Sequence, residues 1–428
     1  MNTNSKILSK QKRLLTFVLV IALVLVSIMS GTGTVQAQSE SLSDGYTPAN
    51  LVKVPFLPQN FVTATTDFSF NLFRKSINMD KNSLVSPTSV SMAMGMTANG
   101  ANGTTLEQFL TLLGQNKLSL KQLNYFNFLL SDILKNNNGS CNFNLANSIW
   151  YGNDITSSIN VDFLQANADF YKASMFKADF RQQSTKADIN NWVNYNTNGL
   201  IKEIIKTLDP ATVMCLINAL SFEADWEKQF SKEATEGYFK LKDGSSVKTP
   251  FLKSKDETYL EGDNATGFIK TYKGGKYSFV AMLPNYDTSL QDYINSLDAS
   301  KFKRFIDSRT LEQTAEVSIP GFGYGYDIKL VQPLAELGFV DAFNPNKANF
   351  SKMINNNDVY IGDILHKTFI QFSEVGTKAG AATIVQVLPT SIPKKEVYFN
   401  RPFVYAIVES GTNIPIFIGT VMNPTSAN

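Results

Sequence analysis

The chain contains a single histidine, His366, and this limits the catalytic chemistry that its side chains can support. Zinc sites built from several histidines, including the helical His-Glu-x-x-His motif, are excluded. A Ser-His-acid hydrolase would have to use His366 as its base, yet no Gly-x-Ser-x-Gly elbow presents a serine. A lone histidine in an apolar, strand-like stretch is more often a hydrogen-bonded core residue. We therefore interpret His366 as a core residue rather than a general base.

The glycine-rich and acidic stretches do not match a cofactor site or a glycosidase site. The stretch from Gly321 to Gly325 lacks the glycine spacing and the lysine of a phosphate-binding loop. Its pattern is typical of a flexible bend after a strand. Asp225 and Glu227 lie beside an aromatic residue and are interpreted as surface or salt-bridge residues rather than paired catalytic carboxylates. No ordinary enzyme is indicated, and no cofactor or metal is expected.

The segment from Glu374 to Glu396 has the most unusual composition in the chain. Its first half consists almost entirely of small residues, and Pro389 and Pro393 interrupt its second half. With a period of two, the only early charge, Lys378, lies on one face. The other face carries only small and apolar residues: Thr377, Ala379, Ala381, Thr383, Val385 and Val387. Such a strand can enter a sheet above a core, although these residues equally allow a flexible loop before a C-terminal hairpin.

Helical and strand patterns alternate along the rest of the chain. Apolar residues at helical spacing predict helices at 67–77, 87–96, 106–113, 118–134, 161–168, 187–197 and 289–297. Strands are predicted at 143–150, 212–222, 277–283, 316–319, 369–372, 403–408 and 414–421, several of them apolar on both faces. Early helices followed mostly by strands indicate one α+β domain over residues 59–428. Residues 38–58 are predicted to form a flexible lead.

The composition is that of an ordinary globular protein. Hydrophobic residues make up 43% of the 428 residues, and the formal net charge of +2 does not indicate nucleic acid as a partner. The chain has two cysteines, Cys141 and Cys215. A single disulfide between them and two free thiols are both compatible with the sequence.

The N-terminus has the pattern of a signal peptide. Basic residues up to Arg13 precede an apolar run at residues 14–29, and Val35-Gln-Ala37 fits a cleavage site for signal peptidase. Cleavage after Ala37 predicts a secreted protein without stable membrane association. The alternative is a retained membrane anchor, because the apolar run is only slightly short of a membrane span.

Several short motifs follow one another in an order that resembles the serpin family. Asn82 begins the pattern Asn-x-x-x-Ser-Pro-x-Ser, and Gly100 begins Gly-Ala-x-Gly-x-Thr. The other matching stretches are Asn191-Trp-Val with Thr197-Asn-Gly, Asn218 to Phe222 with Trp226 and Phe230, Tyr272-Lys-Gly-Gly, Met282-Leu-Pro284, and Asn400-Arg-Pro-Phe403 with Gly419 to Pro424. Each motif alone is weak, but their order from about residue 61 to residue 424 is specific.

The resemblance implies a fold of three β-sheets with eight or nine α-helices and an exposed reactive-centre loop at about residues 374–396. The family spacing places the cleaved bond of this loop between Thr390 and Ser391. The hinge that enters the central sheet would consist of Glu374, Gly376, Thr377, Ala379, Gly380, Ala381, Ala382 and Thr383. The shutter beneath that sheet would consist of Ser86, Ser89, Asn218 and His366. Trp226 would mark the breach, where insertion starts.

Two positions depart from the family pattern. Lys378 replaces an acidic residue that is common in the hinge, but it lies on the predicted solvent face. Gly321 stands where a basic residue often meets the hinge glutamate, so Glu374 is expected to lack that partner. Loss of such a pair matters more where it is buried than at the surface.

The function implied by the resemblance is suicide inhibition of a target protease, without enzymatic turnover. Thr390 is small and follows Val387-Leu-Pro, which favours elastase-like or subtilisin-like serine proteases, with cysteine proteases as further targets. The expected state is a monomer that can polymerise by loop–sheet exchange. The alternative is a non-inhibitory serpin that acts as a binding, carrier or chaperone protein. Small residues throughout the hinge favour inhibition.

Overall fold

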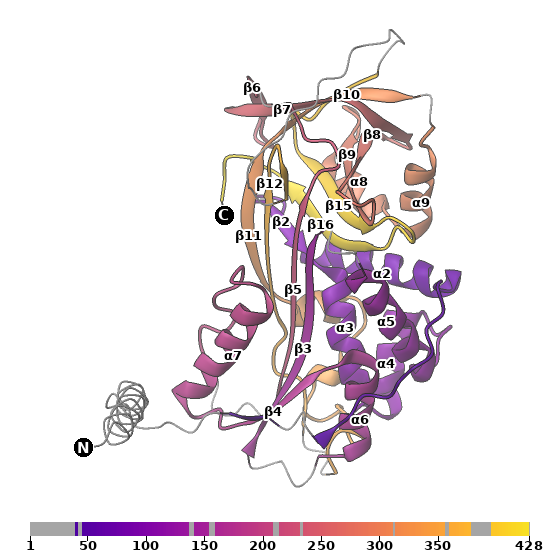
Figure 1. Cartoon of the computed structure of the whole chain (residues 1–428), viewed down its shortest axis with the longest axis vertical. Helices are drawn as coiled ribbons and strands as arrows, with labels where there is room; N and C mark the ends of the chain where they lie inside the picture. Colours follow the sequence, from indigo (N-terminus) through magenta and orange to yellow (C-terminus); the bar gives the residue numbers. More distant parts are fainter. Residues whose placement is uncertain are drawn as a thin grey trace, which may run out of the picture.

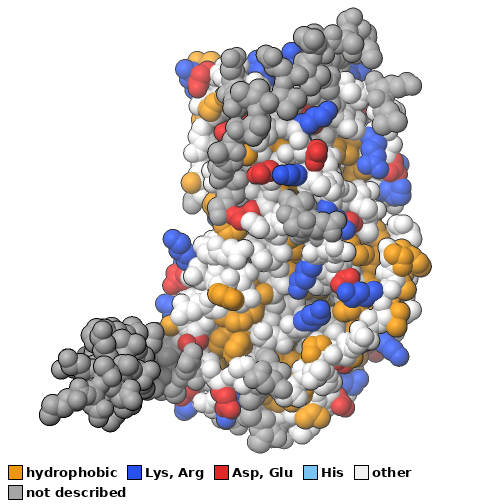
Figure 2. Space-filling model, in the orientation of Figure 1, with side chains coloured by type: hydrophobic (Ala, Val, Ile, Leu, Met, Phe, Trp, Pro, Cys, Tyr) orange, Lys and Arg blue, Asp and Glu red, His pale blue; other side chains and the backbone are white. Residues whose placement is uncertain are grey.

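The computed structural model describes residues 39–41, 45–136, 141–153, 159–208, 214–231, 234–310, 313–355, 359–377 and 395–427. The molecule is elongated, and one large sheet runs along its length (Figure 1). Charged side chains of both signs are interspersed on the face shown in Figure 2, as expected from the balanced composition. The signal peptide predicted at residues 1–37 lies outside the described residues. No helix among the described residues is long and apolar enough to span a bilayer.

The large sheet contains seven strands, and its centre is formed by strands far apart in sequence. Their order across the sheet is β1-β4-β3-β5-β13-β12-β11. The bounds are β1 Glu40–Ser41, β3 Asn142–Gly152, β4 Ser174–Ala178, β5 Met214–Asp225, β11 Phe322–Lys329, β12 Leu365–Phe372 and β13 Gly376–Thr377. β5 and β12 are therefore separated by β13, which is only two residues long.

The remaining strands form a second ladder in the order β14-β10-β7-β8-β9-β15-β16-β2, with β6 paired to β7. Their bounds are β2 Ser83–Val85, β6 Thr235–Lys240, β7 Ser246–Gly262, β8 Ala265–Thr271, β9 Tyr277–Pro284, β10 Thr314–Pro320, β14 Lys395–Tyr398, β15 Phe403–Glu409 and β16 Pro415–Val421. The second and third sheets expected from the resemblance form one ladder here, in which β7, with 17 residues, pairs with β6, β8 and β10.

Nine α-helices occur among the described residues, in agreement with the predicted eight or nine. They are α2 Gln59–Ser76, α3 Pro87–Ala98, α4 Gly103–Gly114, α5 Leu120–Lys135, α6 Val161–Tyr171, α7 Gln183–Asn196, α8 Leu290–Ser296, α9 Ala299–Asp307 and α10 Val331–Glu336. The α+β class predicted from the sequence is confirmed.

Helices cover both faces of the large sheet. Helices α2 to α6 gather on one side, and α7 lies on the other (Figure 1). Neighbouring residues of β3 contribute to different cores: Ile149 belongs to the main core, and Trp150 packs with Ile189 and Val193 of α7. This alternation is the period of two that a strand covered on both faces requires.

The helix starts follow from local sequence signals. Ser119 caps α5 in a capping box with Gln122, and Asp298 caps α9 through the backbone N–H of Lys301. The start of α3 combines Ser86 as N-cap with Pro87 at the first helical position. The N-cap of α3 also contacts the large sheet, because the N–H of Ser86 donates to His366 of β12. This contact belongs to the site described below.

Three details differ from the sequence-based expectations. The predicted flexible bend at 321–325 is wrong: Gly321 is a one-residue link between β10 and β11, and Phe322 to Gly325 belong to β11. The lead is held against the body, where Glu40 pairs with Lys177 of β4 and the hydroxyl of Tyr125 donates to the carbonyl of Val52. The helices α9 and α10 were not predicted.

The two cysteines are free. β3 and β5 are antiparallel, and Cys215 lies opposite Trp150 near one end of the pair. Cys141 directly precedes Asn142, which pairs with Glu223 at the other end. The two thiols thus lie at opposite ends of the same strand pair, too far apart for a disulfide.

Candidate functional site

Two residues of the predicted hinge, Gly376 and Thr377, lie inside the large sheet. Gly376 pairs with Asp225 of β5, and Thr377 pairs with both Ala224 of β5 and Phe372 of β12. A tight turn joins β12 to β13, because Ser373 donates from its N–H and its hydroxyl to the carbonyl of Gly376, at 3.0 and 2.9 Å. The other hinge residues, Ala379 to Thr383, and the predicted bond Thr390–Ser391 lie outside the described residues.

The two strands that flank β13 are much longer than β13 itself. Among the described residues, β5 and β12 are bridged to one another only through the two residues of β13. β13 is antiparallel to both neighbours. Strands whose facing edges are unpaired accept an added strand through main-chain hydrogen bonds. We call this space between β5 and β12 the slot.

Close packing at the mouth of the slot explains the residue types there. A Cβ atom on Gly376 would lie 2.3 Å from the carbonyl oxygen of Ala224 and 2.7 Å from the Cα atom of Asp225. Thr377 is 4% exposed, and its hydroxyl forms a 2.8 Å hydrogen bond with the hydroxyl of Tyr272. Only glycine fits at the first position, and a small side chain that can be buried fits at the second.

The segment from Trp226 to Phe230 binds the chain just before β13. The backbone N–H of Trp226 donates to the carbonyl of Val375 at 2.9 Å, and that of Phe230 donates to the carbonyl of Glu374 at 3.0 Å. The indole Nε1–H of Trp226 donates to the carbonyl of Ser373 at 2.9 Å. Three consecutive carbonyls are thus held by one short segment, at the position where the resemblance places the breach.

Aromatic packing fixes this segment in place. Trp226 is buried and stacks on Tyr272, with ring centroids 4.2 Å apart, and it meets Phe230 and Phe372 edge to face. The carboxylate of Glu374 points to solvent, and Gly321 offers no side chain to meet it. The hinge start is therefore held by backbone hydrogen bonds rather than through its acidic side chain.

The four predicted shutter residues lie together beneath the slot. Ser86 accepts a hydrogen bond from the N–H of Ser89 at the start of α3, and Ser86 donates its own N–H to Nε2 of His366 on β12 at 3.0 Å. The hydroxyl of Ser89 donates to the side-chain oxygen of Asn218 on β5. The N-terminus of α3 therefore connects the two strands that flank the slot.

His366 is a neutral hydrogen-bond acceptor in this arrangement. Burial lowers its pKa to about 4, and acceptance at Nε2 places the ring proton on Nδ1. Its Nε2 atom is engaged by a backbone N–H, so it is not free to act as a general base. This geometry agrees with the interpretation of His366 as a core residue.

Sequence reasoning missed several members of the site. Asn147 of β3 accepts from Asn218 at 2.6 Å and donates to the carbonyl of Tyr171 at 3.0 Å, which extends the shutter contacts across the sheet. The roles of Tyr272 and Ser373 were also missed. The sequence did offer one signal for Asn147, because a polar side chain within an apolar strand indicates a buried hydrogen bond. No group of side chains suited to a metal ion occurs among the described residues.

Comparison with a protein-family model matches residues 63–424 to the serpin (serine protease inhibitor) family. Human neuroserpin is 29% identical over 383 residues, which cover 85% of this chain and 92% of that protein. The leukocyte elastase inhibitor of Xenopus tropicalis is 30% identical over 380 residues, covering 86% of this chain and all of that protein.

Solved structures show the same fold. The thermophilic serpin tengpin in its native state is 40% identical, with a TM-score of 0.84, and the match covers 90% of this chain and 100% of that one. A loop C-sheet serpin polymer is also 40% identical, with a TM-score of 0.75, covering 88% of this chain and 99% of that one.

Proposed function

The chain belongs to the serpin family, and from this premise we propose that it is a secreted suicide inhibitor of elastase-like or subtilisin-like serine proteases, with cysteine proteases as further targets. The observation that supports this proposal most directly is the slot between β5 and β12, which holds Gly376 and Thr377 at its mouth. A strand has begun to form there, antiparallel to both neighbours, and the sequence that follows is suited to extend it.

The register of β13 supports this extension. Thr377 lies opposite Phe372 of β12 and Ala224 of β5. Continued in the same register, Ala379 would face Ile370, Ala381 would face Thr368, and Thr383 would lie between His366 and Asn218. Phe372, Ile370, Thr368 and His366 are all buried. The small-residue face of the hinge would therefore enter the core side of the sheet, and Lys378 would face solvent.

The proposed chemistry begins as ordinary proteolysis. The protease nucleophile attacks the carbonyl carbon of Thr390 and forms an ester or thioester. The bond between Thr390 and Ser391 breaks, and the general acid of the protease protonates the leaving amine of Ser391. The freed hinge then fills the slot and carries the attached protease along the sheet. Insertion must be faster than hydrolysis of the acyl-enzyme. Small hinge residues favour fast insertion, because they pack into the sheet without side-chain rearrangement.

Specificity would depend on the residue before the cleaved bond. Thr390 is small and uncharged, so it suits shallow apolar pockets rather than the acidic pocket of trypsin-like proteases. One relative is named a leukocyte elastase inhibitor, which agrees with this target class. We propose further that residues 1–37 are removed as a signal peptide, and that the mature chain is a monomer able to form loop–sheet polymers.

The test uses the mature chain and a panel of elastase-, subtilisin-, trypsin- and papain-type proteases. The expected result is a denaturant-resistant adduct with an elastase- or subtilisin-type protease, together with a released peptide that begins at Ser391. Intact-mass measurement identifies both products. Clean cleavage near Thr390 across the whole panel, without an adduct, would contradict suicide inhibition.

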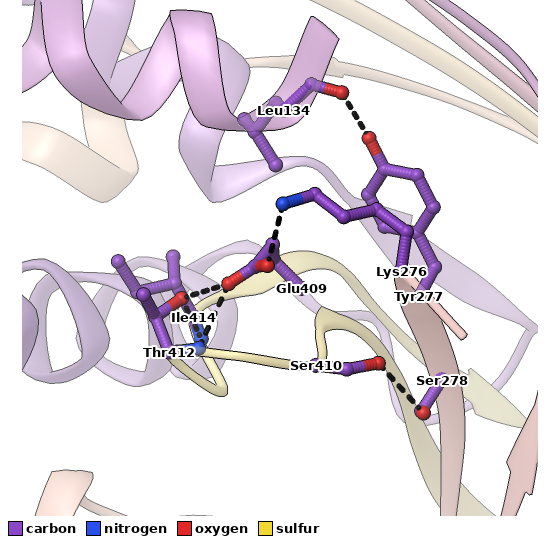
Figure 3. A network of polar contacts seen from close by, with 8 residues as sticks. All are labelled: Leu134, Lys276, Tyr277, Ser278, Glu409, Ser410, Thr412 and Ile414. Carbon is purple, nitrogen blue, oxygen red and sulfur yellow. Dashed lines mark hydrogen bonds and ion pairs between the residues drawn. The ribbon is translucent and has the colours of Figure 1, made fainter. Parts of the chain in front are cut away.

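A second candidate function, carriage of a small ligand, is favoured by one observation. A pocket of about 490 Å³ lies between α2, α9 and the turn that joins β15 to β16. Apolar side chains such as Phe302 line it together with Lys276 and Glu409, which pair at 2.9 Å. Figure 3 shows that Glu409 is also bound by Thr412. Cleavage without an adduct, combined with saturable binding of an apolar ligand, would favour this function.

A further inference from the structure

A buried ion pair lies directly below the segment that holds the hinge. Lys270 of β8 is 2% exposed and pairs with Glu257 of β7, which is also buried. Ser254 completes the group: its hydroxyl donates to Glu257 and accepts from Lys270 at 3.2 Å. Lysine is almost never buried this completely unless it is paired, and Glu257 is the partner here.

The ammonium of Lys270 faces the aromatic rings of the breach. It lies 4.3 Å from the ring centroid of Phe230 and 5.8 Å from that of Trp226. A desolvated cation over an aromatic face is attracted more strongly than one at an exposed site. Burial lowers the pKa of Lys270, whereas Glu257 raises it and so favours the charged form. Lys270 thus packs against the rings of Phe230 and Trp226 and stabilises their positions.

Phe230 and Trp226 are the residues whose N–H groups bind the hinge carbonyls. Lys270 therefore acts on the hinge through one intermediate: Lys270 contacts Phe230, and Phe230 donates to the carbonyl of Glu374. Tyr272, two residues further along the chain, stacks on Trp226 and binds Thr377. The region around β8 thus supports both the breach segment and the first inserted residues. At Gly321, by contrast, no side chain is available to hold Glu374.

We propose that Lys270 is a positioning residue for loop insertion: it holds the Trp226–Phe230 segment so that the hinge start stays seated in the slot. This inference rests on the proposed inhibitory function. Without Lys270, β13 would leave the slot more often, insertion would begin later, and a larger share of cleaved inhibitor would release the protease. The loss of insertion would be measured as a smaller fraction of cleaved inhibitor that remains in the covalent adduct with the protease.

The test compares four variants of the mature chain. K270M removes the positive charge and leaves Glu257 buried without its ion-pair partner. K270M/E257L replaces both members of the pair by apolar side chains, which generally preserves stability. K270R retains a cation that can face Phe230. K276M breaks another ion pair, in which Lys276 is partly exposed and Glu409, at the end of β15, is buried, and it serves as a destabilised control. Adduct fraction and thermal midpoint are measured for each.

We expect K270M and K270M/E257L to lose adduct several-fold, although the double variant keeps the thermal midpoint of the unmodified chain. We expect K270R to restore the adduct, and K276M to lower the midpoint with an unchanged adduct fraction. An unchanged adduct fraction in K270M/E257L would overturn the proposal. So would an equal loss of adduct in K276M and K270M at matched stability.

A second readout separates this inference from the proposed function. Cleavage of the loop by any protease should let the hinge insert, and the chain then gains resistance to heat. The time course of that gain needs no target protease. If the unmodified chain forms no adduct, the proposed function fails. A slower gain in K270M/E257L would still support the role of Lys270, and an identical time course would refute it.

Discussion

The hydroxyl of Tyr272 lies 2.8 Å from the hydroxyl of Thr377, and this contact links β13 of the large sheet to the end of β8 in the second sheet. Both side chains are buried, and each satisfies the other. A buried hydroxyl without a partner costs about 1–3 kcal/mol. The stability of the hinge start therefore depends on a residue far from it in sequence.

Replacement of Tyr272 by Phe leaves the hydroxyl of Thr377 buried without this bond. We expect Y272F to lower the free energy of unfolding by about 1–2 kcal/mol and to lower the adduct fraction. The double variant Y272F/T377V should recover part of the stability, because both polar groups are then absent. Denaturant unfolding of the two variants measures this coupling. Y195F, at a side chain that is 82% exposed, is the control and should change neither quantity.

A charge at Thr377 should abolish insertion. T377R would place a guanidinium where the native side chain is 4% exposed, between Ala224 and Phe372. An unpaired buried charge costs several kcal/mol, so the loop should be cleaved without trapping the protease. E374Q is the matched control, because the carboxylate of Glu374 is exposed. Denaturing gels measure adduct against cleaved chain, and a normal adduct yield in T377R would contradict the slot as the insertion site.

Addition of one methyl group at Gly376 should have a similar effect. In G376A, the new Cβ atom would lie 2.3 Å from the carbonyl oxygen of Ala224, which belongs to the backbone and cannot turn aside. We expect β13 to be displaced and the adduct fraction to fall. G321A is the control, since its Cβ would have its nearest neighbour 3.6 Å away. Equal losses in both variants would show that the effect is not specific to the slot.

The stability of the chain should fall as His366 becomes protonated. Its pKa is about 4 in the folded chain because burial disfavours the charged ring, against an ordinary value of 6.5. The unfolded chain therefore binds the proton first. This contribution to stability is complete above about pH 6.5 and is lost as the pH falls toward 4, in total about 3 kcal/mol.

Urea unfolding at a series of pH values measures this dependence. H366Q keeps an acceptor for the N–H of Ser86 but cannot titrate, so its stability should change less between pH 6.5 and 4. Carboxylates contribute equally to both chains and cancel in the comparison. Parallel curves for the two chains would show that His366 does not carry the effect.

The sequence was informative where function required a particular side chain in a local pattern. The alternation of small residues from Thr377 allowed a strand suited to a sheet as well as a flexible loop, and Thr377, the part of it that the structure describes, is buried in β13. The isolation of His366 in an apolar stretch predicted a core acceptor, and its geometry agrees. Both predictions depend on properties of a few neighbouring residues, which a sequence displays directly.

The remaining features depend on contacts between distant segments. The carbonyls of Ser373 to Val375 are bound largely by backbone N–H groups, which leave no signature in side-chain types. Lys270 and Glu257 resemble ordinary surface residues of alternating strands until the pairing of β7 with β8 places them together beneath Phe230. Gly323 and Gly325 suggested a flexible bend, although the ladder with β12 holds them in β11.

The two residues of β13 also determine which step of the proposed insertion is slow. In most strand additions the slow event is nucleation, since the first contact must overcome chain entropy before any ladder forms. In the proposed mechanism β13 is the nucleus and is formed before cleavage, so insertion would proceed as elongation. The barrier then moves along the sheet to the N-terminus of α3, where Ser86 and Ser89 connect β12 and β5. Substitutions at that helix start should govern how fast the sheet opens, and those at the hinge whether it begins to open.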